Sequence, residues 1–322
     1  MKSKPRTKKP QHYYYLTATG KIPYGMTNDY MFRIVLQKNE DTLKNLICSI
    51  LHLSHSEIKS IKIENPIILG DAIDEKEYHL DVLVLLNNDT HINLEMQVVN
   101  YKNWPDRSVA YLSRVFNDIT RGIDYDKIEP VYHIGFLDFT LYEDHPEFFA
   151  KYHIRNDKDN HLYTDKFHLY VVELNHTDLA TDEDRLYGID TWAKLFKATT
   201  WEEIKMITKD NPSMNSTAES IFLSNSDLAI RQRCRAREDA IIHEKYQSER
   251  IAALSSEVST LSSKNSALSS EVSSLSTKNS ALSSEVSSLS TKNSALSSEV
   301  SSLSSEVARL HKLLEEHGIK SE

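Results

Sequence analysis

Two acidic residues on neighbouring predicted strands are the residues of this sequence best suited to chemistry. Asp81 interrupts the aliphatic run 78–86, YHLDVLVLL. An ionised carboxylate in a half-buried strand is costly unless a cation or hydrogen-bond donors meet it. The next run, 90–99, alternates between apolar and polar residues, and its polar face carries Glu95 and Gln97. The two strands therefore predict a site in which carboxylates need a positive partner.

The turn between these strands decides whether the two acids meet. If the loop has three residues, Leu86 pairs with Thr90, and counting back along the strands places Asp81 directly opposite Glu95. Residues paired in this way have Cβ atoms about 5 Å apart. A two-residue loop would place Asp81 opposite Met96 and separate the acids, because a slip of one residue reverses the faces.

Opposed carboxylates are the oxygen ligands that a hard divalent cation prefers. We expect Mg²⁺ or Mn²⁺ to bind Asp81, Glu95 and the main-chain carbonyl of Met96. Such an ion would activate a water and stabilise the charge of a phosphodiester transition state. Gln97 is neither a base nor a cation, but its amide can orient a water or a phosphate oxygen. The alternative is that these polar residues form an ordinary solvated face of a hairpin.

The helix predicted next, from Asp106 to about Arg121, has an apolar and a basic face. Its core stripe is expected to contain Val109, Leu112, Phe116 and Ile119. The opposite face carries Arg107, Tyr111 and Arg114, which could meet a DNA backbone. A solvated charged face is the other interpretation.

The surrounding pattern of helices and strands predicts an α/β domain. Thr27 or Asn28 can cap a first helix, which would bury Met31, Phe32, Val35 and Leu36. A second amphipathic helix is expected over 43–51. Further strand-like runs are 61–69, 130–139 and 167–174.

The last fifth of the chain contains a heptad repeat within a 14-residue unit that begins at Leu254, Leu268 and Leu282, with an altered copy from Leu296. Leucine occupies every d position, and valine alternates with asparagine at a. This combination favours a parallel, two-stranded coiled coil, because a buried asparagine needs the same asparagine opposite it. The predicted oligomerisation residues are Leu254, Val258, Leu261, Asn265, Leu268, Val272, Leu275, Asn279, Leu282, Val286, Leu289, Asn293, Leu296, Val300, Leu303, Val307, Leu310 and Leu314.

Composition and charge narrow the remaining possibilities. The chain has a net charge of -9, so it lacks a global polycation signature for nucleic acid, although a local basic surface is compatible with this charge. No stretch reaches the roughly 18 to 20 apolar residues that span a bilayer, and no apolar segment follows the basic start. We therefore expect a cytoplasmic protein with no membrane partner. Four arginines, 231, 233, 235 and 237, predict a solvated helix, with DNA contact as the alternative.

Several short segments together resemble the PD-(D/E)XK nuclease family transposases, the recombination-promoting nucleases of bacteria. The resemblance covers about 22–210 and rests on motifs that occur in order: Thr27–Phe32 (TNDYMF), Leu80–Val82 (LDV), Asn93–Gln97 (NLEMQ), Arg107 with Ala110, Tyr111 and Arg114, and Gly122 with Tyr125, Pro130 and Val131.

This resemblance implies a restriction-endonuclease-like core and Mg²⁺-dependent cleavage of DNA. Asp81 and Glu95 would hold the metal, and Gln97 stands where most of the wider superfamily has lysine. That change is typical of this family, but it removes the usual cation beside the scissile phosphate. Asp29 matches the family's helix acid and could be an outer metal ligand. Its carboxylate could equally serve the positive end of the helix dipole.

The sequence thus predicts a metal-dependent DNA endonuclease that is a homodimer through its coiled coil. A catalytically inert DNA-binding or scaffolding protein is the main alternative, and RNA is a further possible substrate. The expected divisions are a basic arm (1–20), the nuclease-like domain (21–225), a helical connector (226–250), the coiled coil (251–316) and a short tail (317–322).

Overall fold

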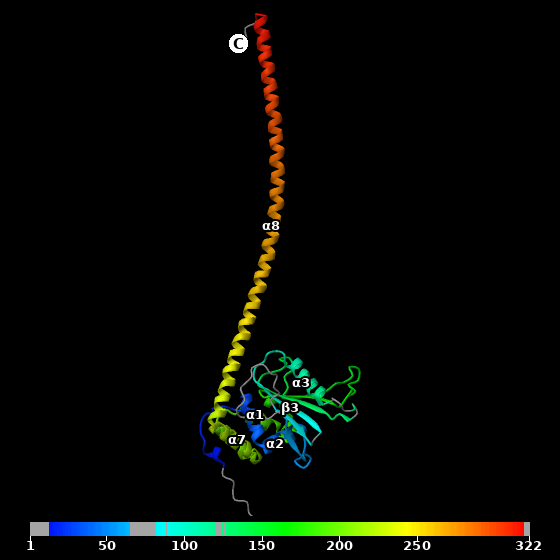
Figure 1. Cartoon of the computed structure of the whole chain (residues 1–322), viewed down its shortest axis with the longest axis vertical. Coiled ribbons are helices and arrows are strands. Elements are labelled where there is room, and N and C mark those ends of the chain that lie inside the picture. Colours follow the sequence, from blue (N-terminus) through cyan, green and yellow to red (C-terminus); the bar gives the residue numbers. More distant parts are fainter. Residues whose placement is uncertain (1–12, 65–81, 88, 120–123, 125–126, 319–322) are drawn as a thin grey trace, which may run out of the picture. The chain divides into compact units, whose positions relative to one another are not determined.

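The computed structural model describes residues 13–64, 82–87, 89–119, 124 and 127–318. The chain forms two compact units, Met1–Lys245 and Tyr246–Glu322. The first unit contains the sheet and most of the helices, and the second is one segment of a long helix (Figure 1). Within the described part of the chain, no helix combines the length and the apolar character needed to cross a membrane.

A six-stranded mixed sheet forms the centre of the first unit, with the strand order β1-β2-β3-β4-β6-β5. Strands β3, β4 and β6 run parallel, and the outer pairs on both sides are antiparallel. The parallel β3–β4 pair requires a crossover, which helix α3 supplies. The strands are β1 (Ile61–Ile63), β2 (Val82–Leu86), β3 (Thr90–Gln97), β4 (Val131–Leu137), β5 (Phe149–Tyr152) and β6 (Phe167–Glu173).

The register between β2 and β3 confirms the three-residue loop. Leu86 pairs with Thr90, and the ladder continues to the pair of Val82 with Leu94. Asn87 adopts a left-handed conformation with φ 54°, which asparagine tolerates better than most residues. Asp81 lies outside the described residues, so its pairing with Glu95 stays a prediction.

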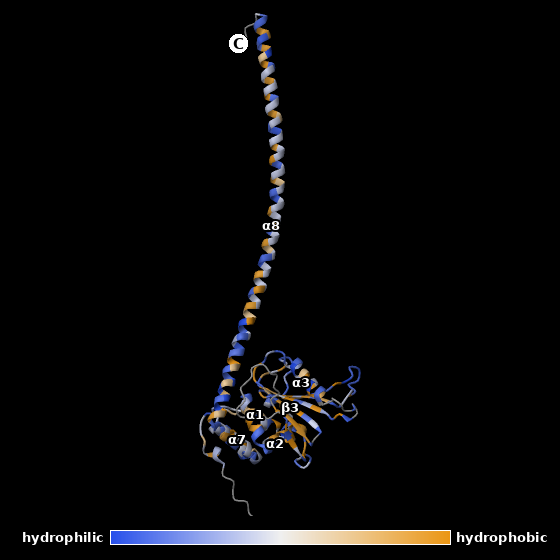
Figure 2. Cartoon of the chain, in the orientation of Figure 1, coloured by the Kyte–Doolittle hydropathy of each residue, from blue (hydrophilic) through white to orange (hydrophobic). Residues whose placement is uncertain are grey.

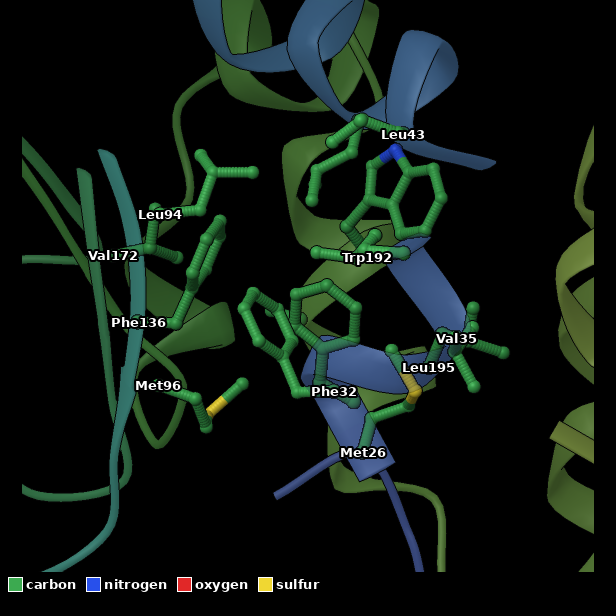
Figure 3. Packing of buried hydrophobic residues seen from close by; sticks show 14 of the residues in the cluster. Met26, Phe32, Val35, Leu43, Leu94, Met96, Phe136, Val172, Trp192 and Leu195 are labelled. Carbon is green, nitrogen blue, oxygen red and sulfur yellow. The ribbon is translucent and has the colours of Figure 1, made fainter. Parts of the chain in front are cut away.

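Helices α1 and α2 form as the sequence predicts. Asn28 is the N-cap of α1, and its side chain accepts a hydrogen bond from the backbone N–H of Met31 at 3.2 Å. The four residues expected on the inner face of α1 are fully buried. Figure 3 shows Phe32 of α1 packed between the sheet residue Phe136 and Leu195 of α5. Helix α1 therefore packs against one face of the sheet. Asp29 lies in the first turn of this helix, at the positive end of its dipole.

Four further helices, which lie between 182 and 226, complete this unit and were not predicted from the sequence. Two of them begin with capping boxes, Thr181 with Asp184 and Thr200 with Glu203. The α-helices of the chain are α1 (Asp29–Lys38), α2 (Glu40–Leu51), α3 (Trp104–Ile119), α4 (Asp182–Leu186), α5 (Ile189–Lys197), α6 (Trp201–Asp210), α7 (Asn215–Ser226) and α8 (Leu228–Glu316). Short 3-10 helices are η1 (Tyr14–Thr17), η3 (Thr177–Leu179) and η4 (Pro212–Met214).

Helix α3 packs against β4 and β6, and its inner face differs from the expected stripe. Val109 was expected in the core, but it is 55% exposed, whereas Tyr111 was expected outside and is 7% exposed. The reason is that the face of α3 on the sheet is the one that carries Trp104, and Val109, five residues further on, lies about 140° around the helix from it. A stripe counted from Trp104 at helical spacing passes through Ser108, Tyr111, Leu112 and Val115, all of which are buried.

Helix α8 runs without interruption for 89 residues. Its first turns belong to the first unit, where Ile230 and Cys234 are completely buried. In the second unit, serine and threonine hydroxyls donate hydrogen bonds to the carbonyl four residues earlier, as Ser266 does to Ser262. Apolar residues recur at intervals along this segment, in contrast with the dense apolar strands of the sheet (Figure 2).

Gly135 provides a test of how α3 is seated on the sheet. A Cβ atom at this position would lie 2.1 Å from Cζ2 of Trp104. We expect Gly135→Ala to lower the free energy of unfolding by about 1–3 kcal/mol, because overpacking a close contact forces the helix to shift. Urea unfolding followed by tryptophan fluorescence measures this. All three tryptophans, at 104, 192 and 201, are buried in the first unit.

Gly25→Ala is the matched control, since its Cβ would meet only the Ala198 carbonyl at 3.4 Å. We expect this control to change stability by less than about 1 kcal/mol. Equal effects of the two substitutions would contradict the described packing of Trp104 over Gly135.

Candidate active site

The carboxylate of Glu95 is buried beneath helix α3. Glu95 pairs across β3 and β4 with Gly135, and its side chain is 2% exposed. Oε1 lies 2.6 Å from Nη2 of Arg107, which α3 brings over the strand. Burial raises the pKa of Glu95 to about 7, although the charge and hydrogen bonding of Arg107 lower it and the nearby Asp29 raises it further. The polar face of β3 is therefore enclosed, and the alternative of a solvated hairpin face is wrong.

A buried histidine lies behind this carboxylate. His133 of β4 is completely buried, and its Nδ1 is 2.9 Å from Nδ2 of Asn93. Burial, together with the charge of Arg107, lowers the pKa of His133 to about 3, so the ring is neutral at physiological pH. If the Asn93 amide donates to Nδ1, the ring proton sits on Nε2, which is 3.7 Å from Oε2 of Glu95. In this tautomer the Nε2–H group of His133, which carries a partial positive charge, faces the carboxylate of Glu95.

Aromatic rings of α3 fix the position of Arg107. The ring of Tyr111 lies below the guanidinium, 5.1 Å from Cζ to the ring centroid, and it also meets the edge of His133. Tyr111 was predicted to contact DNA from the outer face, but its burial makes it a support for Arg107 instead. Arg114, the third residue of that predicted set, is exposed.

A cleft of about 140 Å³ opens beside Arg107. Gln97 lies in its wall, and its Nε2 donates a hydrogen bond to the carbonyl of Val99 at 3.0 Å. The lining is mainly polar and comes from four parts of the first unit: α1, the end of β3 with the segment that follows it, α3, and the start of α8. The lining residues are Asp29, Met96, Gln97, Val98, Val99, Tyr101, Arg107, Arg237, Ile241 and Glu244.

Asp29 reaches the cleft from the first turn of α1. Its Oδ2 accepts a hydrogen bond from Nε of Arg237, so the acid has a cation as well as the helix dipole. Arg237 was expected on a solvated helix, but it is the ion-pair partner of Asp29 and lies beside Glu244, with 3.8 Å between Nη1 and Oε1. Glu95 and Asp29 are thus each paired with an arginine, and Glu244 is a further acid of the cleft.

The structure brings together Asp29, Glu95, Gln97 and Arg107, and Met96 contributes to the same cleft wall. Asp81 lies outside the described residues. Arg114 does not line the cleft in the part of the chain that the structure describes.

The donor set fits a hard divalent cation in its chemistry. Within the described ranges, Oδ1 of Asp29 and Oε2 of Glu95 are buried and accept no hydrogen bond. Carboxylate oxygens without donors are suitable ligands for Mg²⁺ or Mn²⁺. The described residues alone contain no cluster of three or more metal-ligating side chains, so a full ligand set requires a further group.

His133 was missed by reasoning from the sequence, and Arg237 was expected on a solvated helix, with DNA contact as the alternative, but not as the partner of Asp29. His133 interrupts an apolar strand in the same way as Asp81 does, and that interruption was the available signal. Arg237 lies 208 residues from Asp29, and no local pattern links them.

A mixed sheet with a β3–α3–β4 crossover and a buried acid beneath it defines a restriction-endonuclease-like, PD-(D/E)XK core. The model of the PD-(D/E)XK nuclease family transposases matches residues 26–250, and the chain belongs to this family. This membership supports a nuclease or transposase-associated function. Searches of curated proteins and of solved structures gave no match.

The buried charge of Glu95 predicts a pH dependence of stability in EDTA. Its folded pKa, about 7, lies above the ordinary value near 4.5, so the folded state loses stability as the pH rises between these values. Glu95→Gln has no such charge. We expect the variant to gain stability relative to wild type by about 2–4 kcal/mol between pH 4.5 and pH 8, measured by urea unfolding.

Glu129→Gln, which changes an exposed acid, is the control. Its free energy of unfolding should follow the same pH dependence as that of wild type across this range. If Glu95→Gln also ran parallel to wild type, the carboxylate of Glu95 would not be buried as described.

Proposed function

We propose that this protein is a Mg²⁺- or Mn²⁺-dependent DNA endonuclease of the transposase-associated type. The observation that carries the proposal is the buried carboxylate of Glu95, which is ion-paired with Arg107, a residue that lines a polar cleft together with Gln97 and Asp29. Burial of this kind is costly, and it is common where an acid serves a reaction. Family membership supports the same reaction class.

The proposed ligands of the metal are Asp81, Glu95 and the carbonyl of Met96, with Asp29 as an outer ligand. When bound, the ion would supply an activated water and neutralise charge on the phosphate. The rest of the chemistry belongs to the protein. Neutral His133 lies beside this carboxylate, with its Nε2 3.7 Å from Oε2 of Glu95, and Asn93 orients the ring through a hydrogen bond. Gln97 is placed to orient a water or a phosphate oxygen.

Arg107 would have two tasks in this proposal. Without metal it neutralises Glu95, and its side chain is 31% exposed at the cleft, so the guanidinium is also accessible to a phosphate. Tyr111 limits its freedom through the contact with the ring face.

An inert DNA-binding or scaffolding protein is the second candidate. It is favoured by one observation: Glu95 and Asp29 are already paired with arginines, and Gln97 provides no cation on β3. DNA binding without cleavage under any divalent cation would support this candidate.

Cleavage of supercoiled plasmid DNA tests the proposed activity. We expect nicking in Mg²⁺ or Mn²⁺, none in EDTA, and a rate at least about 100-fold lower in Asp81→Asn and Glu95→Gln. Asp89→Asn is the control, because Asp89 is an exposed acid in the β2–β3 turn. This control should cleave at the wild-type rate. Equal nicking by wild type and both site variants would contradict the proposal.

The second unit supports a further part of the proposal, a parallel homodimer through α8. A single serine-rich helix of this length has little intrinsic stability in water, since most helical stability comes from packing an apolar face. The apolar a and d residues along it are unburied in one chain: Val258 is 64% exposed and Leu268 is 58% exposed. Pairing with a second copy would bury this row.

The asparagines at a positions provide a test of the dimer. Replacing Asn265, Asn279 and Asn293 with valine should stabilise the association but give a mixture of oligomeric states, because the paired asparagines no longer select two parallel chains. Analytical ultracentrifugation of the full-length protein measures the species. Wild type should sediment as one dimeric species.

The matched control places valine at the outward f positions 263, 277 and 291 instead. This change adds the same apolar groups without touching the predicted interface, and the control should stay dimeric. A monomeric wild type would contradict the predicted coiled coil.

A further inference from the structure

The start of helix α8 forms one wall of the cleft. Arg237, Ile241 and Glu244 line the cavity, and Glu244 also accepts a hydrogen bond from the hydroxyl of Tyr101 at 2.7 Å. These contacts lie within the first unit, which extends to Lys245. The helix that carries the heptad repeat therefore also contributes side chains to the candidate active site.

The cleft needs positive charge that β3 does not supply. A phosphate in the cleft would meet the carboxylates of Asp29 and Glu244, with the buried Glu95 behind Arg107, and like charges at short range repel strongly. Gln97 is neutral, so it can donate a hydrogen bond but cannot offset this repulsion. Any compensating charge must come from another element that lines the same cavity.

Arg237 satisfies this requirement in position and chemistry. It lines the same cleft as Gln97, and its side chain is 39% exposed, so solvent reaches it from the cavity. Its guanidinium is held between two acids, Asp29 on α1 and Glu244 on α8 itself. A guanidinium held in place in this way is suited to bind phosphate oxygens, because its donors form a planar fork and its charge is permanent.

We infer that Arg237 of α8 is a phosphate-binding residue of this site and supplies the cation that position 97 lacks. The inference rests on the proposed nuclease function for its substrate class, a nucleic acid backbone. It assigns to α8 a part in the chemistry in addition to oligomerisation.

DNA binding in EDTA tests the inference without cleavage. We would measure the affinity of the full-length protein for a short fluorescent duplex by anisotropy, between about 50 and 200 mM salt. Arg237→Gln should weaken binding. It should also make the negative slope of log affinity against log salt shallower by about 0.9, the value for one lost phosphate contact. Arg237→Lys should keep the slope, since it retains the charge.

Arg235→Gln is the matched control for net charge. Arg235 lies two residues away on the same helix, its side chain is 77% exposed, and its ion-pair partner is Asp239, outside the cleft. This control should keep the wild-type slope. An Arg237→Gln slope equal to that of wild type would overturn the inference, and so would a wild type that binds no DNA.

A double-mutant cycle separates phosphate binding from simple neutralisation of Asp29. In the Asp29→Asn background the acid no longer repels DNA, yet Arg237→Gln should still reduce the salt slope by about 0.9. If the effect of Arg237→Gln disappears in this background, Arg237 acts only as the partner of Asp29 and the inference is wrong.

Cleavage in Mg²⁺ distinguishes this inference from the proposed function. If wild type nicks plasmid and Arg237→Gln does so at least about tenfold more slowly, with partial recovery in Arg237→Lys, the proposed nuclease function and the inference about Arg237 are both supported. If wild type fails to nick while the slope of Arg237→Gln still falls, the proposed nuclease activity is wrong and the phosphate site stands.

Discussion

Burial of the Glu95 carboxylate within the sheet is the constraint on which the rest of the first unit depends. A charge of this kind in a protein interior costs several kcal/mol unless a partner offsets it. Arg107 provides this partner from α3, 2.6 Å away, and Trp104 and Tyr111 seat that helix on β4. Gly135 leaves the space that Trp104 fills. The crossover helix, the glycine in β4 and the neutral His133 are therefore consequences of keeping one acid buried.

The two ion pairs between an acid and an arginine keep the site close to neutral. A metal ion could replace the arginines as partner of the acids, and a phosphate could replace the acids as partner of the arginines. Glu95 with Arg107 and Asp29 with Arg237 are two acid–base pairs around one polar cleft. A divalent cation at the acids would release both guanidinium groups from their neutralising role, and a phosphate could then meet them. The arginines come from α3 and α8, elements on either side of the cleft, so the enzyme would not require the lysine that β3 lacks.

The sequence predicts the parts of this site that follow local rules. The alternation of β3 and the length of the turn fix the Leu86–Thr90 register, and Asn28 caps α1 where its side chain meets Met31. The predicted face of α3 was wrong because Trp104 and Tyr111, which lie on one side of the helix, anchor it to the sheet, whereas the prediction centred the core on Val109 and Phe116. The pairing of Arg237 with Asp29 could not be found, since it joins the two ends of the unit and depends on tertiary packing alone. The starts of helices α4 and α6 do carry local signals, the capping residues Thr181 and Thr200 with an acid three residues later.

Direct binding of Mn²⁺ is the measurement that tests the central claim, that Glu95 is held as a metal ligand. The decrease of the free-ion electron paramagnetic resonance signal reports binding to the full-length protein without reference to cleavage. We expect wild type to bind Mn²⁺, and Glu95→Gln to bind at least about tenfold more weakly. Equal affinity of Glu95→Gln and wild type for Mn²⁺ would contradict the account, because the buried acid would then serve only the ion pair with Arg107.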